Sequence, residues 1–304
     1  MPAPVPGSAP APATARAATA RGVTFLVLSA VLFGGMAFLT KIAGARLPGA
    51  EIAAVRFTLG LVLTLALAAA GVVTVEAPRR HLPLLLVRGF AGGTAVILFF
   101  IAIAHGNVGT ATLLNFTSPV FTALFAWMVL RERLSGWVVS AFVLTAAGVA
   151  LVWRGAHQGP MSLLGWQSLG LLSAVLSGVA VTAIRGLRRR EAVSAWTVFL
   201  FFNAAGLACS APVAAVGFVW PAPREWGLIL ALSALSIAGQ VLFTAALAWV
   251  QAAVSGVIQQ VTVVVAFALG CAVLHEPLGG WQVVGAALAM AGAAWAARLV
   301  RPEE

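Results

Sequence analysis

One long apolar stretch, residues 108–130, carries amide and hydroxyl side chains at helical spacing. Its polar and helix-bending residues follow one another at intervals of three, four and three, so they share one face of a helix. They are Thr112, Asn115, Pro119 and Thr122. Amides and hydroxyls donate and accept hydrogen bonds, so this face is suited to hold the polar end of a small solute.

Similar chemistry recurs 144 residues further along the chain, where Gln259 stands at the position equivalent to Asn115. Gln240 and Ser177 add polar groups in neighbouring apolar stretches, and several aromatic residues are placed to line a cavity beside them. The predicted substrate-binding residues are Asn115, Gln259, Gln240, Thr112, Ser177, Phe33, Phe99 and Trp249.

The alternative role for these polar residues is to hold helices together, since polar pairs between membrane helices contribute about 0.6 kcal/mol on average. We prefer that interpretation for Ser29, Ser173, Thr145 and Asn203, and both interpretations stay open for Asn115 and Gln259. The predicted hinge or packing residues are Pro119, Gly34, Gly92 and Gly93. Close packing is the commoner use of small residues in helix bundles.

Ionisable side chains are placed less favourably for a central site. Arg56 precedes a predicted span, where a long side chain reaches to the interface, so an anionic solute finds no arginine or lysine within a span. Glu132, Glu276 and the other six glutamates fall at helix ends, in loops or in the tail. Because proton relays use buried carboxylates or histidines, the sequence indicates transport without obligatory proton coupling.

Several reaction classes are excluded by residues that the chain lacks. It contains no aspartate, which removes aspartyl proteolysis and an aspartyl-phosphate intermediate. Its single lysine, Lys41, is not part of a phosphate-binding loop. Cys209 and Cys271 stand alone, without the spacing of a metal site or a disulfide. We therefore expect no catalytic residues, no metal and no cofactor.

The elements that position these residues are membrane-spanning helices. Of the 304 residues, 62% are hydrophobic and 9% are charged, against roughly 25% charged in a soluble domain. A helix needs about 20 apolar residues to cross a bilayer. Ten spans are predicted, at 22–40, 57–75, 89–104, 108–130, 136–153, 159–184, 192–223, 226–249, 252–274 and 280–297.

An internal repeat organises these spans. Residues 130–139 return as 274–283 with six of ten positions identical, and residues 28–34 return as 172–178 with one difference. A five-helix unit has an odd number of crossings, so its second copy is inverted. The predicted fold is an all-α membrane protein of ten transmembrane helices in two inverted five-helix repeats, the arrangement of many secondary transporters.

Basic residues predict the orientation. If the N-terminus is cytoplasmic, thirteen of the 18 lysines and arginines fall on the cytoplasmic side and five on the other. The predicted segments are a disordered cytoplasmic tail (1–20), two repeats (21–155 and 156–299) and a cytoplasmic C-terminal tail (300–304). Topology and contacts with anionic headgroups explain the net charge of +10, so we expect no nucleic-acid partner. We expect a multi-pass plasma-membrane protein that binds a small molecule and lipid. Its expected state is a monomer or a weak oligomer.

The chain also resembles a known family. Each copy ends its fourth helix with Leu-x-Glu-x-Leu before a Gly-Trp start to the fifth, as in the ten-span EamA-type exporters of the drug/metabolite transporter superfamily, which include the aromatic amino-acid exporters. Residues 115–121 match the family's proline-containing fourth helix, and Arg56-Phe57 match the start of its second. The second copy departs from the pattern, with Val263 for Pro119 and Leu200 for Arg56.

The resemblance implies export of a small organic solute by alternating access around a central cavity. The first helix lacks the carboxylate with which small cation exporters bind their cargo, so a neutral or zwitterionic solute is expected, such as an amino acid or a related metabolite. The alternative is a membrane-embedded enzyme acting on a lipid or isoprenoid. Against it stand the missing aspartate and the lack of a histidine motif.

Overall fold

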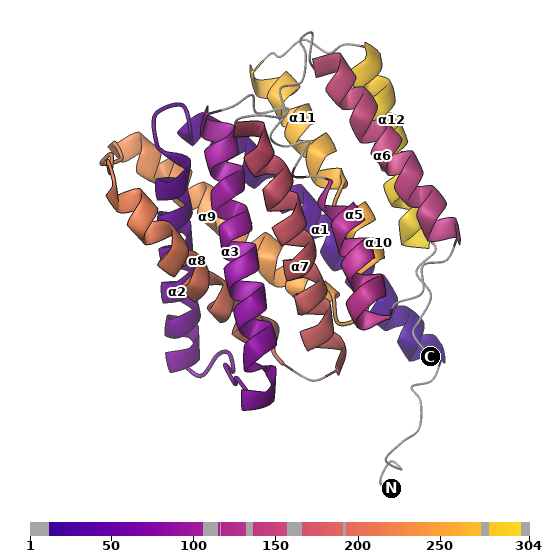
Figure 1. Ribbon diagram of the computed structural model, residues 1–304, viewed down its shortest axis with the longest axis horizontal. Helices are drawn as coiled ribbons and strands as arrows, with labels where there is room; N and C mark the ends of the chain where they lie inside the picture. Colours follow the sequence, from indigo (N-terminus) through magenta and orange to yellow (C-terminus); the bar gives the residue numbers. More distant parts are fainter. Residues whose placement is uncertain are drawn as a thin grey trace, which may run out of the picture.

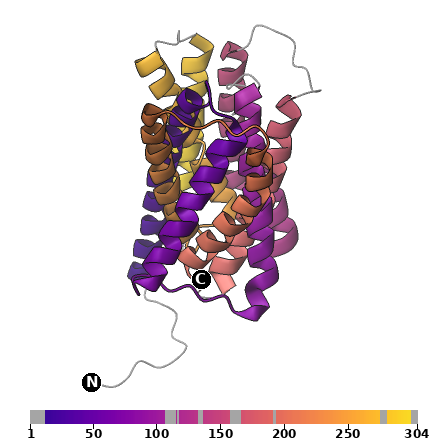
Figure 2. The same ribbon diagram turned by 90° about the vertical axis from the view of Figure 1, so that its left-hand side faces the viewer.

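A computed structural model of the chain describes residues 12–105, 115, 117–131, 136–156, 166–190, 193–274 and 280–298. The helices of the first repeat are α1 (Pro12–Ala43), α2 (Gly49–Ala69), the short turn η1 (Arg79–His81), α3 (Leu82–His105), α5 (Ser118–Phe125), the π-helical turn η2 (Ala126–Leu130) and α6 (Gly136–Ala156). Those of the second are α7 (Trp166–Arg190), α8 (Ala195–Ala215), α9 (Pro223–Ala246), α10 (Ala252–Ile258), α11 (Val261–Leu274) and α12 (Gly280–Arg298). Figures 1 and 2 show them as one bundle of roughly aligned helices.

Among the described residues, six helices are long and apolar enough to cross a bilayer, with α10 and α11 forming shorter apolar pieces. The six segments are Ala18–Ala43, Gly49–Ala69, Arg79–Ala102, Ser168–Arg188, Ala195–Ala215 and Pro223–Ala246. With the shorter helices the bundle reaches about ten helices, so the predicted all-helical membrane fold is confirmed.

Packing between helices follows the 144-residue repeat. α1 packs against α9 and α11, and α7, the equivalent of α1, packs against α3 and α5, their equivalents. Each repeat thus places its first helix against the third and fourth helices of the other. α2 lies against α8, and α6 lies against α12 at one edge of the bundle (Figure 1). Because both of these pairs join equivalent helices, they mark the axis that relates the two repeats.

Small residues allow these close approaches. A Cβ on Gly34 of α1 would lie 2.6 Å from the Cβ of Val265 on α11, and a Cβ on the equivalent Gly178 of α7 would lie 2.7 Å from the Cβ of Phe121 on α5. Gly93 meets the Cα of Gly206 equally closely. A side chain at Gly34 or Gly93 would therefore meet the neighbouring helix.

Two clusters of buried hydrophobic residues fill the bundle. The first includes Leu26, Leu85 and Leu187, and the second includes Leu47, Ile52 and Phe100. Phe33 packs against the first cluster and Met36 and Val96 against the second. These three residues belong to the candidate site described below, which takes wall residues from both clusters.

Helix boundaries differ from the sequence prediction in two ways. α1 begins at Pro12, so residues 12–20 are helical rather than disordered. This segment is alanine-rich, and alanine has the highest helix propensity, while proline is tolerated in a first turn. Three helices also include an arginine that lies just outside the span predicted from hydropathy: α2 contains Arg56, α3 contains Arg88 and α7 contains Arg185.

All three arginines are buried, at 3%, 3% and 0% relative exposure. They therefore do not belong in a count of loop charges. Without them, the excess of basic residues stays on the predicted cytoplasmic side. Arg185 donates hydrogen bonds to the carbonyl oxygens of Leu247 (2.9 Å) and Ala248 (3.2 Å), just beyond the end of α9. Its charge is thus accommodated by the structure, because the last carbonyls of a helix lack partners within it.

Candidate functional site

The fourth helix of each repeat is interrupted beside its amide residue. In the second repeat α10 ends at Ile258, Gln259 and Gln260 form a turn, and α11 begins at Val261. In the first, Thr117 lies in a turn and α5 begins at Ser118, three residues after Asn115. Interrupted helices within a membrane bundle leave backbone and side-chain polar groups available to a ligand.

Each amide bonds to a serine on the first helix of the other repeat. Asn115 Nδ2 donates to Ser173 Oγ (2.7 Å), which in turn donates to the carbonyl oxygen of Ala95 (2.7 Å). Gln259 Nε2 donates to Ser29 Oγ (3.2 Å). Both bonds join equivalent positions, so they are two copies of one contact between the repeats. The helix-joining role predicted for Ser29 and Ser173 agrees with this geometry.

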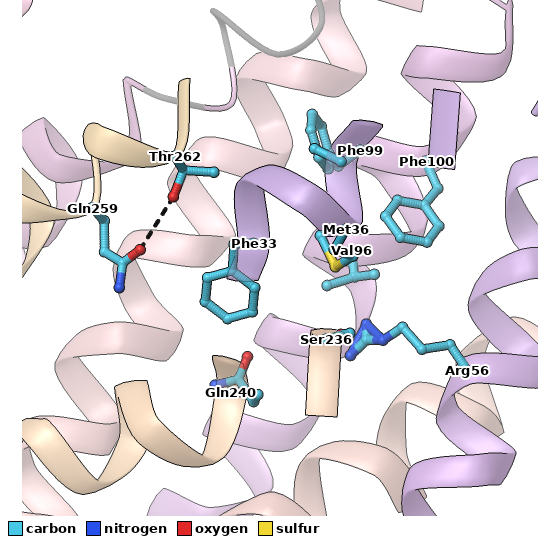
Figure 3. A pocket seen from close by; sticks show the side chains of 11 residues that line it. Phe33, Met36, Arg56, Val96, Phe99, Phe100, Ser236, Gln240, Gln259 and Thr262 are labelled. Carbon is cyan, nitrogen blue, oxygen red and sulfur yellow. Dashed lines mark hydrogen bonds between the residues drawn. The ribbon is translucent and has the colours of Figure 1, made fainter. Parts of the chain in front are cut away.

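A cavity of about 160 Å³ lies beside the interruption in the second repeat. Its lining comes from α1, α2, α3 and α9 and from the α10–α11 break, and Figure 3 shows these side chains converging. The lining residues are Phe33, Met36, Ala37, Arg56, Val96, Phe99, Phe100, Ser236, Gln240, Gln259 and Thr262. Each repeat thus contributes part of the wall.

Polar groups of the cavity come mainly from the second repeat. Thr262 Oγ1 donates to Gln259 Oε1 (3.3 Å, the dashed line in Figure 3), and Gln240 Nε2 donates to Thr244 Oγ1 (3.3 Å). Both contacts are longer than the usual 2.7–3.2 Å, so a ligand with better-placed groups can replace them. Apolar side chains, Phe33 and Phe99 among them, form most of the remaining wall.

Arg56 lies in the cavity wall, contrary to the expectation that it reaches to the interface. Figure 3 shows its guanidinium extending from α2 towards Ser236 of α9. Its ring contacts are with Phe57 (4.5 Å to the centroid) and Phe202 (5.3 Å), and its Nε has no hydrogen-bond partner among the described residues. Packing against these rings buries the side chain. The expectation that an anionic solute meets no arginine within a span was therefore wrong.

Arg88 on α3 contacts the same aromatic ring as Arg56 but is not among the residues that line the cavity. Its guanidinium carbon is 4.0 Å from the centroid of the same Phe202 ring, and its Nε also lacks a partner among the described residues. Gly92, one turn further along α3, leaves room for this guanidinium, which would overlap any Cβ there. Gly92 thus makes room for an arginine side chain, which its place beside Gly93 in the sequence does not indicate. Two guanidiniums thus share one aromatic ring, and one of them lines the cavity.

The structure brings together half of the predicted substrate-binding residues. Phe33, Phe99, Gln240 and Gln259 line the cavity. Asn115 and Ser177 are not among its lining residues, and Trp249 packs edge-on against Phe25 with 6.1 Å between ring centroids. Thr112 lies outside the described residues, as do Glu132 and Glu276. Pro119 is buried against Gly256 of α10, where the two interrupted helices meet.

The two repeats contact each other at the end of the bundle where α2 begins. Arg46, in the α1–α2 turn, donates to both carboxylate oxygens of Glu225 in the first turn of α9, and to the carbonyl oxygen of Trp220 (3.0 Å). The hydrogen bond to Glu225 raises the pKa of Arg46, so Arg46 stays charged. The carboxylate of Glu51 accepts from the backbone N–H of Val219 (2.9 Å).

Equivalent segments meet at the opposite end through neutral hydrogen bonds. Ser194 Oγ, just before α8, donates to the carbonyl oxygen of Thr74 (2.8 Å), and the backbone N–H of Glu76 donates to Thr197 Oγ1 (3.1 Å). Ser194 also accepts from the N–H of Thr197, which caps α8. Each second helix therefore bonds at its first turn to the loop that follows the other second helix.

Sequence reasoning missed Arg56, Arg88 and Glu51 as buried groups. Glu51 is 1% exposed and one of its oxygens has no partner among the described residues. A signal for the arginines was present, because both stand where the other repeat has leucine, Leu200 and Leu232. No group of three metal-ligating side chains occurs within the described part of the chain.

Comparison with known proteins identifies the fold. The model of the EamA-like transporter family matches the chain twice, over residues 20–154 and 164–298. A crystal structure superposes with a TM-score of 0.71 at 25% sequence identity, covering 94% of this chain and 98% of the other.

Two named relatives match over most of their lengths. The pseudopaline exporter CntI of Pseudomonas aeruginosa is 34% identical over 273 residues, covering 89% of this chain and 91% of that protein. Solute carrier family 35 member G1 of Homo sapiens is 26% identical over 284 residues, covering 88% and 76%. Both names describe transport, which decides against the membrane-embedded enzyme. The chain belongs to the EamA-like transporter family of the drug/metabolite transporter superfamily and is a multi-pass secondary transporter.

Proposed function

We propose that this transporter exports a small zwitterionic or neutral organic solute, an amino acid or related metabolite, by alternating access around the cavity between its repeats. The observation that carries the proposal is the position of the cavity. It lies beside an interrupted helix and takes its wall from both repeats, so relative motion of the repeats changes the access to it.

Cavity size and composition favour such a solute. A cavity of about 160 Å³ is comparable with engineered cavities of about 150 Å³ that hold a benzene molecule. None of the described residues that line it is acidic, so they offer a cationic solute no counter-ion. Aromatic and aliphatic side chains suit a short apolar group, while Gln240, Gln259 and Ser236 offer hydrogen bonds to a polar end.

Contacts at the two ends of the bundle support alternating access. Equivalent segments join the repeats at each end, with an ion pair between Arg46 and Glu225 at one and neutral hydrogen bonds through Ser194 and Thr197 at the other. Breaking one set while keeping the other opens the cavity to one side. Export as the direction is supported by the relative that is named an exporter.

The test is flux of labelled solutes from a panel of amino acids and related metabolites in proteoliposomes. Replacing Gln240 or Gln259 by leucine removes a donor and an acceptor from the cavity, and an unmatched polar group costs about 1–3 kcal/mol. We therefore expect affinity to fall by about tenfold or more.

Gln251→Leu is the matched control. This glutamine precedes α10, makes no capping hydrogen bond and does not line the cavity. If Gln240→Leu and Gln259→Leu both transport as well as Gln251→Leu, the cavity is not the solute site and the proposal fails.

A further inference from the structure

Arg56 presents a buried positive charge to the cavity, without an ion-pair partner among the described residues. Its side chain is 3% exposed and lines the cavity, and it forms no ion pair with any residue that the structure describes. The guanidinium makes cation–π contacts with the rings of Phe57 and Phe202. A buried charge is normally paired or hydrogen-bonded, and the described residues leave this guanidinium without such a partner.

The other repeat shows that the fold does not require a charge at this place. The positions equivalent to Arg56 and Arg88 hold Leu200 and Leu232, in helices α8 and α9 that correspond to α2 and α3. Leu232 is fully buried. The same backbone framework thus accepts leucine where the first repeat buries two guanidiniums, which points to a role for the arginines outside folding.

Arg185 provides the contrast. It is also buried, but it donates to the carbonyl oxygens of Leu247 and Ala248 beyond the end of α9. Its donors are used within the chain, whereas the Nε atoms of Arg56 and Arg88 have no partner among the described residues. Burial alone therefore does not explain why Arg56 Nε lacks a hydrogen-bond partner among the described residues.

We propose that Arg56 binds a carboxylate group of the transported solute, with Arg88 adding a second positive charge at the shared Phe202 ring. The inference rests on the proposed function and narrows its substrate class to small organic acids and zwitterions that carry a carboxylate. The remaining part of the solute lies against Phe33 and Phe99, within reach of the amides of the second repeat.

Guanidinium and carboxylate match in shape as well as charge. The planar guanidinium donates two parallel hydrogen bonds to a carboxylate, and stacking on Phe57 and Phe202 fixes the plane of Arg56. A carboxylate fits this wall better than a phosphate, because Arg56 is the single basic residue among the described lining residues and a phosphate carries up to two negative charges. The apolar walls also exclude water, which strengthens an ionic contact.

The experiment uses the purified full chain in detergent and measures its melting temperature with a panel of probes. The panel contains neutral L-amino acids, short 2-hydroxy acids and 2-oxo acids, the carboxamide of each, and inorganic phosphate. We expect some carboxylates to raise the melting temperature while their carboxamides do not. A charge-assisted pair of this kind corresponds to a change of about ten- to hundredfold in affinity.

Variants separate a binding role from a structural one. Arg56→Leu should abolish stabilisation by the carboxylates, Arg56→Lys should retain part of it, and Arg88→Leu should weaken it less than Arg56→Leu. Without ligand, Arg56→Leu should melt at the same or a higher temperature, since Leu200 occupies the equivalent site. Arg185→Leu, the matched control, should melt at a lower temperature.

Four results overturn the proposal: no carboxylate stabilises the chain, carboxamides bind as well as acids, phosphate replaces the carboxylates, or Arg56→Leu keeps wild-type affinity. If carboxamides bind as well as acids but Gln259→Leu still loses flux, the cavity function stands and only the carboxylate assignment fails. If neither Gln240→Leu nor Gln259→Leu affects flux, the proposed function itself fails.

Discussion

Asn115 donates a hydrogen bond through its Nδ2 to Ser173 Oγ at 2.7 Å, joining the fourth helix of one repeat to the first helix of the other. The equivalent contact, from Gln259 to Ser29, is longer at 3.2 Å and belongs to the cavity wall. Equivalent positions have thus diverged: one amide holds the repeats together, and the other also faces the cavity.

This divergence predicts different effects of two equivalent substitutions. Asn115→Leu removes an inter-repeat bond worth about 0.6–1 kcal/mol, so it should lower the melting temperature while flux per folded molecule stays near wild type. Gln259→Leu should lower apparent affinity by about tenfold or more. Thermal melts and proteoliposome flux on the same preparations measure both effects. An equal loss of affinity in Asn115→Leu would show that Asn115 also contacts solute.

The ion pair between Arg46 and Glu225 is predicted to control access at its end of the bundle. Arg46→Gln removes the charged contact while leaving the turn intact, so that end should open more often. The reporter is a cysteine at position 236 in the cavity wall, with Cys209 and Cys271 replaced by alanine. Its labelling by an impermeant maleimide should become faster in Arg46→Gln. In the wild type, labelling should become faster at high salt, because the ion pair is exposed and is screened by ions.

The charge-swapped variant, Arg46→Glu with Glu225→Arg, is the control for that experiment. It restores an ion pair of opposite polarity and should return labelling towards the wild-type rate. Labelling that is the same in all three proteins would show that the pair does not restrict access.

Gly34 is predicted to tolerate no side chain, because a Cβ there would lie 2.6 Å from Val265. Gly34→Ala should therefore lower stability by about 1–3 kcal/mol, the usual cost of overpacking. Gly227→Ala on α9 is the matched control, since nothing lies within 4 Å of its Cβ position, and a helical alanine there should raise stability by up to about 1 kcal/mol. Urea or thermal unfolding measures both, and Val265→Ala should partly rescue Gly34→Ala. Equal effects of the two alanine substitutions would contradict the close approach.

Transport is predicted to continue without a proton gradient. The described residues that line the cavity include no acidic side chain and no histidine, and proton relays in membranes use such groups. Solute flux in proteoliposomes should therefore be unchanged when an imposed pH gradient is collapsed with an ionophore. Flux that stops on collapse would direct attention to Glu51, which is buried in α2 and has one oxygen without a partner among the described residues, and Glu51→Gln would test it.

Both termini are predicted to be cytoplasmic, from the excess of basic residues on one side. Ala77 and Ala222 lie in loops at opposite ends of the bundle. In a background without the native cysteines, Ala222→Cys should react with an impermeant maleimide on intact cells, and Ala77→Cys only after permeabilisation. The reverse pattern would invert the orientation and place the Arg46–Glu225 contact on the cytoplasmic side.

Sequence alone determined the architecture of this protein. Hydropathy over windows of about 20 residues is set by the bilayer, which every span meets separately, so ten helices were predictable without any knowledge of their packing. The 144-residue repeat was equally accessible, because duplicated segments such as 28–34 and 172–178 keep their residues in register. The repeat makes Asn115 equivalent to Gln259, and it therefore predicts two symmetric polar positions.

Tertiary structure decided what those positions do and which charges are buried. An arginine near the end of an apolar run satisfies the hydropathy rule whether it extends to the interface or turns inward. For Arg56 and Arg88 the choice depends on Phe202, more than 100 residues away in the chain, whose ring lies 5.3 Å and 4.0 Å from the two guanidinium carbons. Likewise, Asn115 and Gln259 are equivalent in sequence, but only one of them lines the cavity. Such contacts between distant segments are absent from local periodicity, because they arise when helices from both repeats pack together.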